Sequence, residues 1–468
     1  MTHQDNPDAV TRIHQVSGKA EGPLRPTNVR WLIVAMLMGF TILGHFNRVS
    51  ISVAANAKFI GPGLLTAEQM GQVYSTFLLI YTLCMLPGGW VIDHIGPRLA
   101  MAGMGLGIGF SVVLTGGLGW LGLPIASLFI PLLFVRGIAG SLSTPLHPGA
   151  ARSVSLWLPL TSRSTANGLV TAGALIGISL SYPGFGWLMN QFDWSWAFVI
   201  SGSTMMGFSI FWLLVSTDDA ASHPKANATE KQMVVLNSVV PSSSRASVGD
   251  FTALFRNRGL LILTFSYAAL SYFQYLFFYW IEFYFGKELK LPEDASRHAS
   301  FIVTMAMAVG MAFGGVLADQ LSRRIGLRWG CRSIVIAGML MSAVFAWFGV
   351  AAEDPNHVIW LFSLALGSLG LCEGIFWTSA PALEPKNGGL ACAFLNTIGN
   401  AGGILAPVCT PWIGAHYGWP TAIGVACCVC AAGAVLWLWI DPLDPKAETI
   451  SPNWLSILSR SGSNALKK

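Results

Sequence analysis

The sequence predicts an all-α membrane protein with twelve transmembrane helices in two pseudo-symmetric six-helix halves. Hydrophobic residues make up 53% of the 468 residues and charged residues only 10%, whereas soluble domains contain about 25% charged residues. Apolar stretches that reach the roughly 20 residues needed to cross a bilayer recur along most of the chain. The alternating segments of about ten residues that indicate a membrane β-barrel do not occur in the sequence.

Six spans are predicted in each half of the chain. In the first half, 30–216, they lie near residues 30–55, 69–92, 98–119, 125–149, 164–190 and 194–216. In the second half, 259–440, they lie near residues 259–284, 297–317, 329–351, 357–382, 388–414 and 417–440.

The remaining segments are polar. Residues 217–258 are serine-rich and predict a flexible cytoplasmic linker between the halves. Residues 1–29 and 441–468 are expected to be cytoplasmic tails. Because the first thirty residues are polar, we expect no cleavable signal peptide, and the first span should act as the insertion signal.

The distribution of lysine and arginine predicts the orientation. With a cytoplasmic N-terminus, 21 basic residues fall inside and four fall outside, namely Lys58, Lys287, Lys290 and Arg297. Because loops rich in Lys and Arg remain in the cytoplasm, we expect both termini there and a location in the cell (inner) membrane.

Small residues predict how the helices pack. Of the 51 glycines, many fall within predicted spans, among them Gly103, Gly105, Gly107 and Gly109. Small residues let helix backbones approach closely in lipid, so these glycines indicate close helix packing rather than loops.

The remaining composition excludes several kinds of site. The eight cysteines lie mostly in apolar spans without metal-ligand spacing, so we expect no disulfide framework, metal or cofactor. The net charge of +5 comes from loops and does not indicate nucleic-acid binding.

Two similar charged loops follow the second and eighth predicted spans. Their shared positions are Gly89, Asp93, Arg98, Gly315, Asp319, Arg323 and Arg324. An aspartate at a helix C-terminus opposes the helix dipole unless another helix or an arginine compensates it. The recurrence at equivalent places in two halves therefore indicates a common role.

These loops resemble those of the major facilitator superfamily, in which they form a cytoplasmic gate between helices 2 and 11. Residues 30–440 are similar, more specifically, to the anion:cation symporter family, whose members carry galactonate, glucarate, hexuronates, phthalate and related organic anions. The stretches that carry this resemblance are YTLCMLPGGW at 81–90, WSWAF at 194–198, YFQYLFFYW at 272–280 and FLNTIGNAGG at 394–403. The resemblance implies the major facilitator fold, with substrate bound near the membrane midplane between the halves.

Arg48 is the main candidate for substrate binding. It lies inside the first span with no carboxylate nearby in that segment, and a cation at membrane depth normally faces a partner or a water-filled path. It matches the helix 1 arginine with which family members bind the substrate carboxylate, a group that suits the planar guanidinium fork. A structural ion pair with an acid on another helix is the alternative.

The resemblance also reveals departures that bear on proton coupling. Arg136 resembles the family's helix 4 arginine, for which substrate contact, coupling and pairing within the protein all remain open. Asn47 and Ser143 stand where family members commonly carry acids, and neither can take up a proton.

Other titratable residues are therefore candidates for the coupling site. His45 shares a helix face with Arg48 and titrates in the useful range, although a neutral hydrogen-bonding role is the alternative. Glu373 is predicted to be the one clearly intramembrane acid, because Glu282 lies toward the outer end of the seventh span. It could carry the proton or pair with an arginine. His147 is a weaker candidate.

Further polar residues in the spans could bind the rest of the substrate. They are Asn47, Tyr81, Tyr272, Gln274, Tyr279, Thr378, Ser379, Asn396 and Asn400. The resemblance implies a substrate role for Tyr81 and for an asparagine of the Phe-x-Asn region, while Ala174 replaces a glutamine of the relatives. A less hydroxylated anion is therefore plausible, and helix–helix hydrogen bonding is the alternative for each polar residue.

Together these observations predict a transporter, not an enzyme. We expect a monomer that imports a small organic anion by alternating access, with a proton or another cation. ATP is excluded as the energy source because no GxxxxGK[ST] loop occurs. An exchanger or uniporter is the main alternative, given Asn47 and Ser143. A transporter-like sensor or a membrane enzyme such as an acyltransferase is less well supported, since the tails are short and no catalytic set is present.

Overall fold

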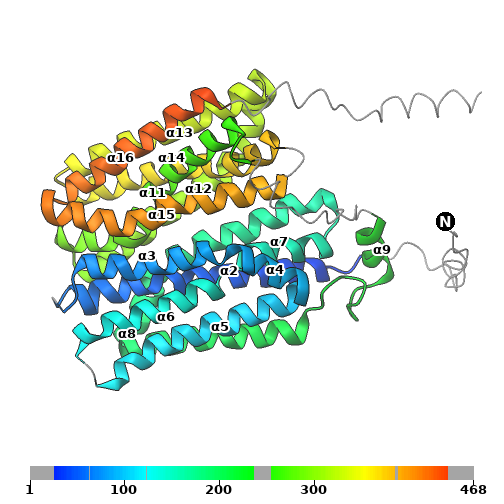
Figure 1. Cartoon of the computed structure of the whole chain (residues 1–468), viewed down its shortest axis with the longest axis horizontal. Coiled ribbons are helices and arrows are strands. Elements are labelled where there is room, and N and C mark those ends of the chain that lie inside the picture. The colour runs from blue at the N-terminus through cyan, green and yellow to red at the C-terminus, as the bar shows by residue number, and fades with distance from the viewer. Residues whose placement is uncertain (1–25, 63, 123, 237–253, 385–387, 441–468) are drawn as a thin grey trace, which may run out of the picture.

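A computed structural model describes residues 26–62, 64–122, 124–236, 254–384 and 388–440. These residues contain no strand, and their helices form two bundles that lie side by side (Figure 1). The first bundle contains α2 (Val29–Ala54), α3 (Ala67–Leu83), α4 (Met85–Ile95), α5 (Pro97–Gly117), α6 (Phe129–Leu142), α7 (Leu146–Trp157) and α8 (Leu160–Val215). The second contains α11 (Arg258–Lys287), α12 (Glu293–Ile325), α13 (Leu327–Ala351), α14 (Pro355–Leu383), α15 (Gly388–Tyr417) and α16 (Trp419–Leu436).

Short helical turns extend some of these helices. A π-helical turn, Ala55–Ile60, continues α2. Three 3-10 turns lie at Leu118–Leu121, Ile125–Leu128 and Trp437–Trp439.

The twelve predicted spans are all present, although ten of the described helices count as long and apolar enough to cross a membrane. The fifth and sixth spans both lie in α8, and they are two helices that meet at Asp193, whose backbone is not helical (φ 70°, ψ 161°). The second span is divided between α3 and α4 at Cys84. The predicted all-α fold with two six-helix halves is confirmed.

The fourth span is interrupted in a way that shapes the centre of the protein. Helix α6 ends at Leu142, a turn follows, and α7 begins at Leu146. Pro145 and Pro148 lack the amide hydrogen that a continuous helix would need, which accounts for a break at this point. The break places His147 at the start of α7.

Glycines allow close contact between α5 and α8, as the sequence predicts. A Cβ at Gly109 would lie 2.6 Å from the Gly202 carbonyl oxygen, and one at Gly105 would lie 2.0 Å from Ser209 Oγ. A Cβ at Gly107 would meet Leu142 at 2.8 Å. Gly103 is the exception, since nothing lies within 4 Å of its Cβ position.

The first part of the linker is ordered, contrary to the prediction of a flexible segment. Residues 228–236 form helix α9 (Ala228–Leu236), which lies beside the start of α2 (Figure 1). Glu230 is fully buried there and pairs with Arg30, whose Nη1 lies 3.4 Å from Glu230 Oε1. The Arg30 amide also donates to Glu230 Oε1 at 3.1 Å. This ion pair fixes α9 at what we call the linker side of the bundles, which is the side where α2 begins.

We expect Gly109→Leu to destabilise the protein and Gly103→Leu, on the same helix, to leave it unchanged. The Gly109 side chain would collide with backbone atoms of α8, and overpacking of this kind costs about 1–3 kcal/mol. Thermal unfolding in detergent, followed by intrinsic fluorescence, measures the difference. Equal unfolding midpoints for the two variants would contradict this account of the α5–α8 contact.

Candidate anion-binding site

A cavity of about 530 Å³ lies between the two halves. Helices α2, α3, α4, α7 and α8 line it from the first half, and α11, α12, α14 and α15 line it from the second. The predicted binding and coupling residues that line it are His45, Arg48, Tyr81, Gln274, Tyr279, Glu373, Asn396 and Asn400. The structure therefore brings together most of the polar residues that the sequence singles out.

Arg48 lies in the wall of this cavity and is held by aromatic side chains. Its Nη2 donates a hydrogen bond to Tyr275 Oη at 2.8 Å. Its guanidinium carbon lies 5.0 Å from the ring centre of Phe77, 5.2 Å from that of Tyr275 and 5.8 Å from that of Tyr81. Each such cation–π contact contributes about 0.5–2 kcal/mol.

Arg48 has no acidic partner among the described residues. Within the described ranges no carboxylate lies within 4.0 Å of its guanidinium nitrogens. The sequence left open whether Arg48 binds substrate or forms a structural ion pair, and no such ion pair is found in the described ranges. What remains is an oriented, positively charged fork at the surface of a cavity, which is the chemistry that binds a carboxylate or a sulfonate.

Arg136 lies behind the cavity wall rather than in it. Its Nη2 donates to the backbone carbonyl oxygen of Arg48 at 2.9 Å, and its guanidinium carbon lies 4.6 Å from the ring centre of Phe77. Phe77 therefore contacts both guanidinium groups. This arrangement indicates that Arg136 positions α2 and Arg48, and Arg136 is absent from the residues that line the cavity.

His45 and His147 form a pair beside Arg48. Their ring centres lie 5.4 Å apart at an interplanar angle of 62°, and both rings line the cavity. His45 Nδ1 lies 3.0 Å from the Thr41 carbonyl oxygen, and because a carbonyl can only accept, Nδ1 carries the hydrogen. The Nε2 atom of a neutral His45 is then an acceptor.

Glu373 occupies the wall of the second half. Its Oε1 accepts hydrogen bonds from Tyr267 Oη at 2.6 Å and from Trp377 Nε1 at 3.2 Å. Its Oε2 is buried and has no donor among the described residues. Pairing with an arginine, one of the two predicted roles, is not found in the described part of the chain.

Several predicted residues lie outside the cavity lining. They are Asn47, Tyr272, Thr378 and Ser379. Asn47 is 1% exposed, and neither its amide nitrogen nor its amide oxygen has a partner among the described residues. Thr378 donates to the Ile375 carbonyl oxygen of its own helix at 3.1 Å. These positions show that neighbours in sequence can face away from a site.

Tyr275, which binds Arg48, is one residue of the cavity that sequence reasoning missed. It lies on the same helix face as Tyr279 and Tyr272, at spacings of four and three residues, so helical periodicity could have singled it out. Tyr267 and Trp377 were also missed. Both donate a hydrogen bond to Glu373, Tyr267 from another helix and Trp377 from the next turn of the same helix.

The two halves meet on the side opposite the linker. Tyr182 Oη of α8 donates to the Phe278 carbonyl oxygen of α11 at 2.9 Å, and Ser75 Oγ of α3 donates to the Ile404 carbonyl oxygen of α15 at 2.6 Å. The ring of Tyr74 stacks on that of Tyr279, with centres 4.7 Å apart. These contacts close the interface beyond the cavity.

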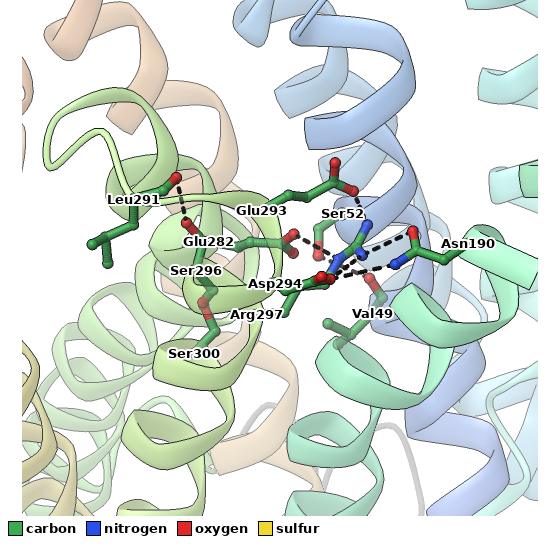
Figure 2. Close-up of polar contacts among 10 residues, drawn as sticks. All are labelled: Val49, Ser52, Asn190, Glu282, Leu291, Glu293, Asp294, Ser296, Arg297 and Ser300. Atoms are coloured by element: carbon green, nitrogen blue, oxygen red, sulfur yellow. Dashed lines mark hydrogen bonds and ion pairs between the residues drawn. The ribbon is translucent and has the colours of Figure 1, made fainter.

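A charged cluster around Arg297 completes this closure, as Figure 2 shows. Arg297 is 2% exposed, and its Nε lies 3.5 Å from Glu282 Oε1. Its Nη1 lies 3.3 Å from Asp294 Oδ1 and 3.4 Å from Asn190 Oδ1 of α8, and its Nη2 pairs with Glu293.

This cluster bears on two predictions. Glu282 is 2% exposed and lies near the end of α11 opposite the linker, toward the outer end as the sequence predicts, so Glu373 as the one clearly intramembrane acid stays a prediction. Arg297, which the charge count places outside, links α12 to α11, and Glu282, Glu293 and Asp294 compensate its charge.

The predicted gating residues lie on the linker side. The side chains of Asp93, Asp319 and Arg323 are outside the described residues, and the described Gly89, Gly315 and Arg324 make no contact that tests a gate. Arg98 binds the end of α8: its amide donates to Asp218 Oδ1 at 3.2 Å and its guanidinium to the Leu213 carbonyl oxygen. The predicted gate thus stays a prediction.

The comparison with protein families agrees with this architecture. The profile of the Major Facilitator Superfamily matches residues 29–328 and 324–462. The chain belongs to this superfamily. Together with its long apolar helices, this shows a multi-pass membrane protein.

Several curated relatives are transporters of acids. The chain is 25% identical to the D-galactonate transporter of Escherichia coli O6:H1, over 88% of this chain and 96% of that protein. It is 27% identical to a probable galactarate/D-glucarate transporter of Bacillus subtilis, over 83% and 86% of the two chains. It is 26% identical to a probable sulfoacetate transporter of Cupriavidus necator, over 88% and 94%. These names support an organic-anion transporter of this superfamily.

A solved structure confirms the fold. A crystal structure of a bacterial homologue of the human lysosomal transporter Spinster, in an inward-facing and unoccupied conformation, superposes with a TM-score of 0.67. It covers 89% of this chain and 96% of that one at 16% sequence identity.

We expect Tyr275→Phe to lower the stability of the empty protein, because it removes the hydroxyl that accepts a hydrogen bond from the Arg48 guanidinium. A hydrogen bond to a charged group contributes about 1.5–3 kcal/mol. Thermal unfolding of the ligand-free protein measures the effect. Tyr284→Phe, on the same helix, is the control because no described residue bonds its hydroxyl. An unchanged midpoint for Tyr275→Phe would show that the bond contributes nothing.

Proposed function

We propose that this protein is a secondary active transporter that imports a small organic anion by alternating access, with proton coupling. The observation that carries the proposal is Arg48, a guanidinium that faces the central cavity without a carboxylate partner among the described residues. A charge in this position is costly unless the transported anion supplies the compensation.

The expected substrate is a carboxylate or sulfonate. Relatives named as carriers of galactonate, galactarate or glucarate, and sulfoacetate all bind molecules with an acidic group. In our proposal that group binds the Arg48 fork, while Gln274, Asn396 and Asn400 bind the rest of the molecule from the second half. The proposal assigns these three residues to specificity rather than to charge recognition.

The arrangement of the two halves supports alternating access. The cavity lining extends toward the linker side through residues further along α7 and near the beginnings of α8 and α15, such as Ala151, Asn167 and Cys392. On the opposite side the Tyr182–Phe278 and Ser75–Ile404 hydrogen bonds close the interface. In our proposal this state releases substrate on the linker side, which the charge distribution assigns to the cytoplasm.

Proton coupling requires a titratable group in the cavity. Asn47 and Ser143 cannot serve, so His45 and Glu373 are the candidates, with Arg136 acting on them through its position behind Arg48. An exchanger or uniporter without a coupled proton is the second candidate function, favoured by the same two substitutions.

The proposal includes the setting of the protein. We place it in the cell (inner) membrane as a monomer, with both termini cytoplasmic. The linker-side residues Gly89, Asp93, Arg98, Gly315, Asp319, Arg323 and Arg324 are proposed as its cytoplasmic gate.

We expect Arg48→Ala to abolish uptake of carboxylates, and Arg48→Lys to recover little of it because an ammonium lacks the planar fork. Loss of a buried charged partner costs about 2–5 kcal/mol, which is roughly 30-fold or more in affinity. The measurement is uptake of labelled galactonate, glucarate and sulfoacetate into proteoliposomes. Arg152→Ala, at an exposed position of α7, is the matched control. Normal uptake by folded Arg48→Ala protein would reject the proposed site.

We expect an imposed pH gradient, alkaline inside, to accelerate uptake into these proteoliposomes. A coupled proton moving down its gradient drives the anion inward, so a protonophore should remove the acceleration. The membrane potential is clamped with potassium and valinomycin so that only the proton gradient acts. Uptake that ignores the gradient but responds to anion loaded inside would identify an exchanger instead.

A further inference from the structure

A substrate with a single carboxylate that binds Arg48 would leave the neighbouring pair of histidines, His45 and His147, without a ligand. His45 and His147 come from α2 and α7, and their rings meet at the cavity wall with centres 5.4 Å apart. The broken fourth span brings His147 there, because α7 begins only one residue earlier. The two imidazoles and the Arg48 guanidinium thus lie on one wall of one cavity.

The hydrogen bonding of the pair leaves acceptor positions open. His45 Nδ1 donates to the Thr41 carbonyl oxygen at 3.0 Å, so Nε2 is its acceptor atom. The ring nitrogens of His147 bond no other described residue. Either ring can therefore take up a proton, and the protonated ring can donate to an acidic group in the cavity.

The charges around the two histidines decide when one of them takes up a proton. Arg48 on α2 and Tyr81 on α3 line the same recess as the pair. Tyr275 and Tyr279 on α11 face Arg48, and Arg136 lies behind Arg48. Glu373 lies on the wall of the second half, bonded to Tyr267 and Trp377. A proton on the pair is repelled by Arg48 in the empty cavity, and an anion bound between them turns this repulsion into attraction.

We propose that His45 and His147 form a subsite for the second acidic group of an organic dianion, whose first acidic group binds Arg48. This inference rests on the proposed function and narrows it to a substrate class. One proton enters the pair with the dianion, so that two positive charges face two negative ones. A second proton on the histidine pair would be repelled by the first, so we expect one proton to bind with each dianion. Because binding energies are reciprocal, the proton strengthens anion binding as much as the anion strengthens proton binding.

The test compares dianions with monoanions of similar shape over a range of pH. The probes are glucarate with gluconate, succinate with butyrate, and sulfoacetate with acetate. Binding to the purified full-length protein is measured by isothermal titration calorimetry between pH 6 and pH 8. For wild-type protein we expect dianion affinity to rise by about tenfold per pH unit of acidification, since one proton is bound, and monoanion affinity to change little.

We expect His45→Gln and His147→Gln to lose the pH dependence of dianion binding and to keep monoanion binding. Retained monoanion binding shows that each variant is folded with an intact Arg48 site, and His147→Asn provides a second variant if the glutamine disturbs α7. His416→Gln is the matched control, because His416 Nδ1 also contacts a carbonyl oxygen four residues earlier, at 2.8 Å, but lies outside the cavity. It should retain the wild-type pH dependence.

The remaining outcomes overturn the proposal. Equal pH dependence for dianions and monoanions would exclude a second acidic-group subsite while leaving the proposed function intact. Loss of the pH dependence in Glu373→Gln, with both histidine variants unaffected, would place the proton on Glu373 instead. Failure of the wild-type protein to bind any of the six acids would overturn the proposed function itself, and the subsite with it.

Discussion

The unneutralised guanidinium of Arg48 is the constraint around which the centre of this protein is organised. Three aromatic rings, from α3 and α11, surround the charge, and Tyr275 accepts one of its hydrogens. Such contacts stabilise a cation by a few kcal/mol in total but do not cancel its charge. Arg136 donates a hydrogen bond to the Arg48 carbonyl oxygen and, like Arg48, makes a cation–π contact with Phe77. The wall thus keeps its positive charge while its geometry is fixed.

The kinds of contact that join the halves differ from those that stabilise each half. The ion pairs of Arg297 all lie within the second half: Glu282 is on α11, and Glu293 and Asp294 are on α12 with Arg297. Its polar contact with the first half among the described residues is to the neutral Asn190. The other links between the halves described above are hydrogen bonds to carbonyl oxygens, a stacked tyrosine pair and the contact of Arg48 with Tyr275. Neutral hydrogen bonds contribute about 0.5–1.5 kcal/mol each. None of these links is an ion pair, so in the proposed mechanism the halves can separate without breaking one.

Asn47 and Ser143 change the electrostatics of the site as well as its capacity for protons. Asn47 precedes Arg48 in the sequence, but its side chain is buried outside the cavity lining. Ser143 Oγ donates to the Ala139 carbonyl oxygen of the preceding helix. No described carboxylate takes their place next to Arg48, so the first half contributes one permanent positive charge and two imidazoles to the cavity. In the proposed function, selectivity for anions follows from the charge of the wall rather than from its shape.

The sequence by itself determined the twelve spans, the division into halves and the choice of Arg48 as the main candidate for substrate binding, because apolar length and an intramembrane charge are local properties of the chain. Helical periodicity also placed His45 on the face of Arg48. Only the tertiary structure decided which polar residues share the cavity, because that depends on how helices distant in sequence are rotated against one another. In the tertiary structure Tyr275 contacts Arg48 and Glu282 pairs with Arg297, whereas Thr378 and Ser379 lie outside the cavity lining. The break in the fourth span brings His147 into contact with His45. Contacts between helices carry no signature in a single sequence, since each side chain meets its partner only after both halves have packed.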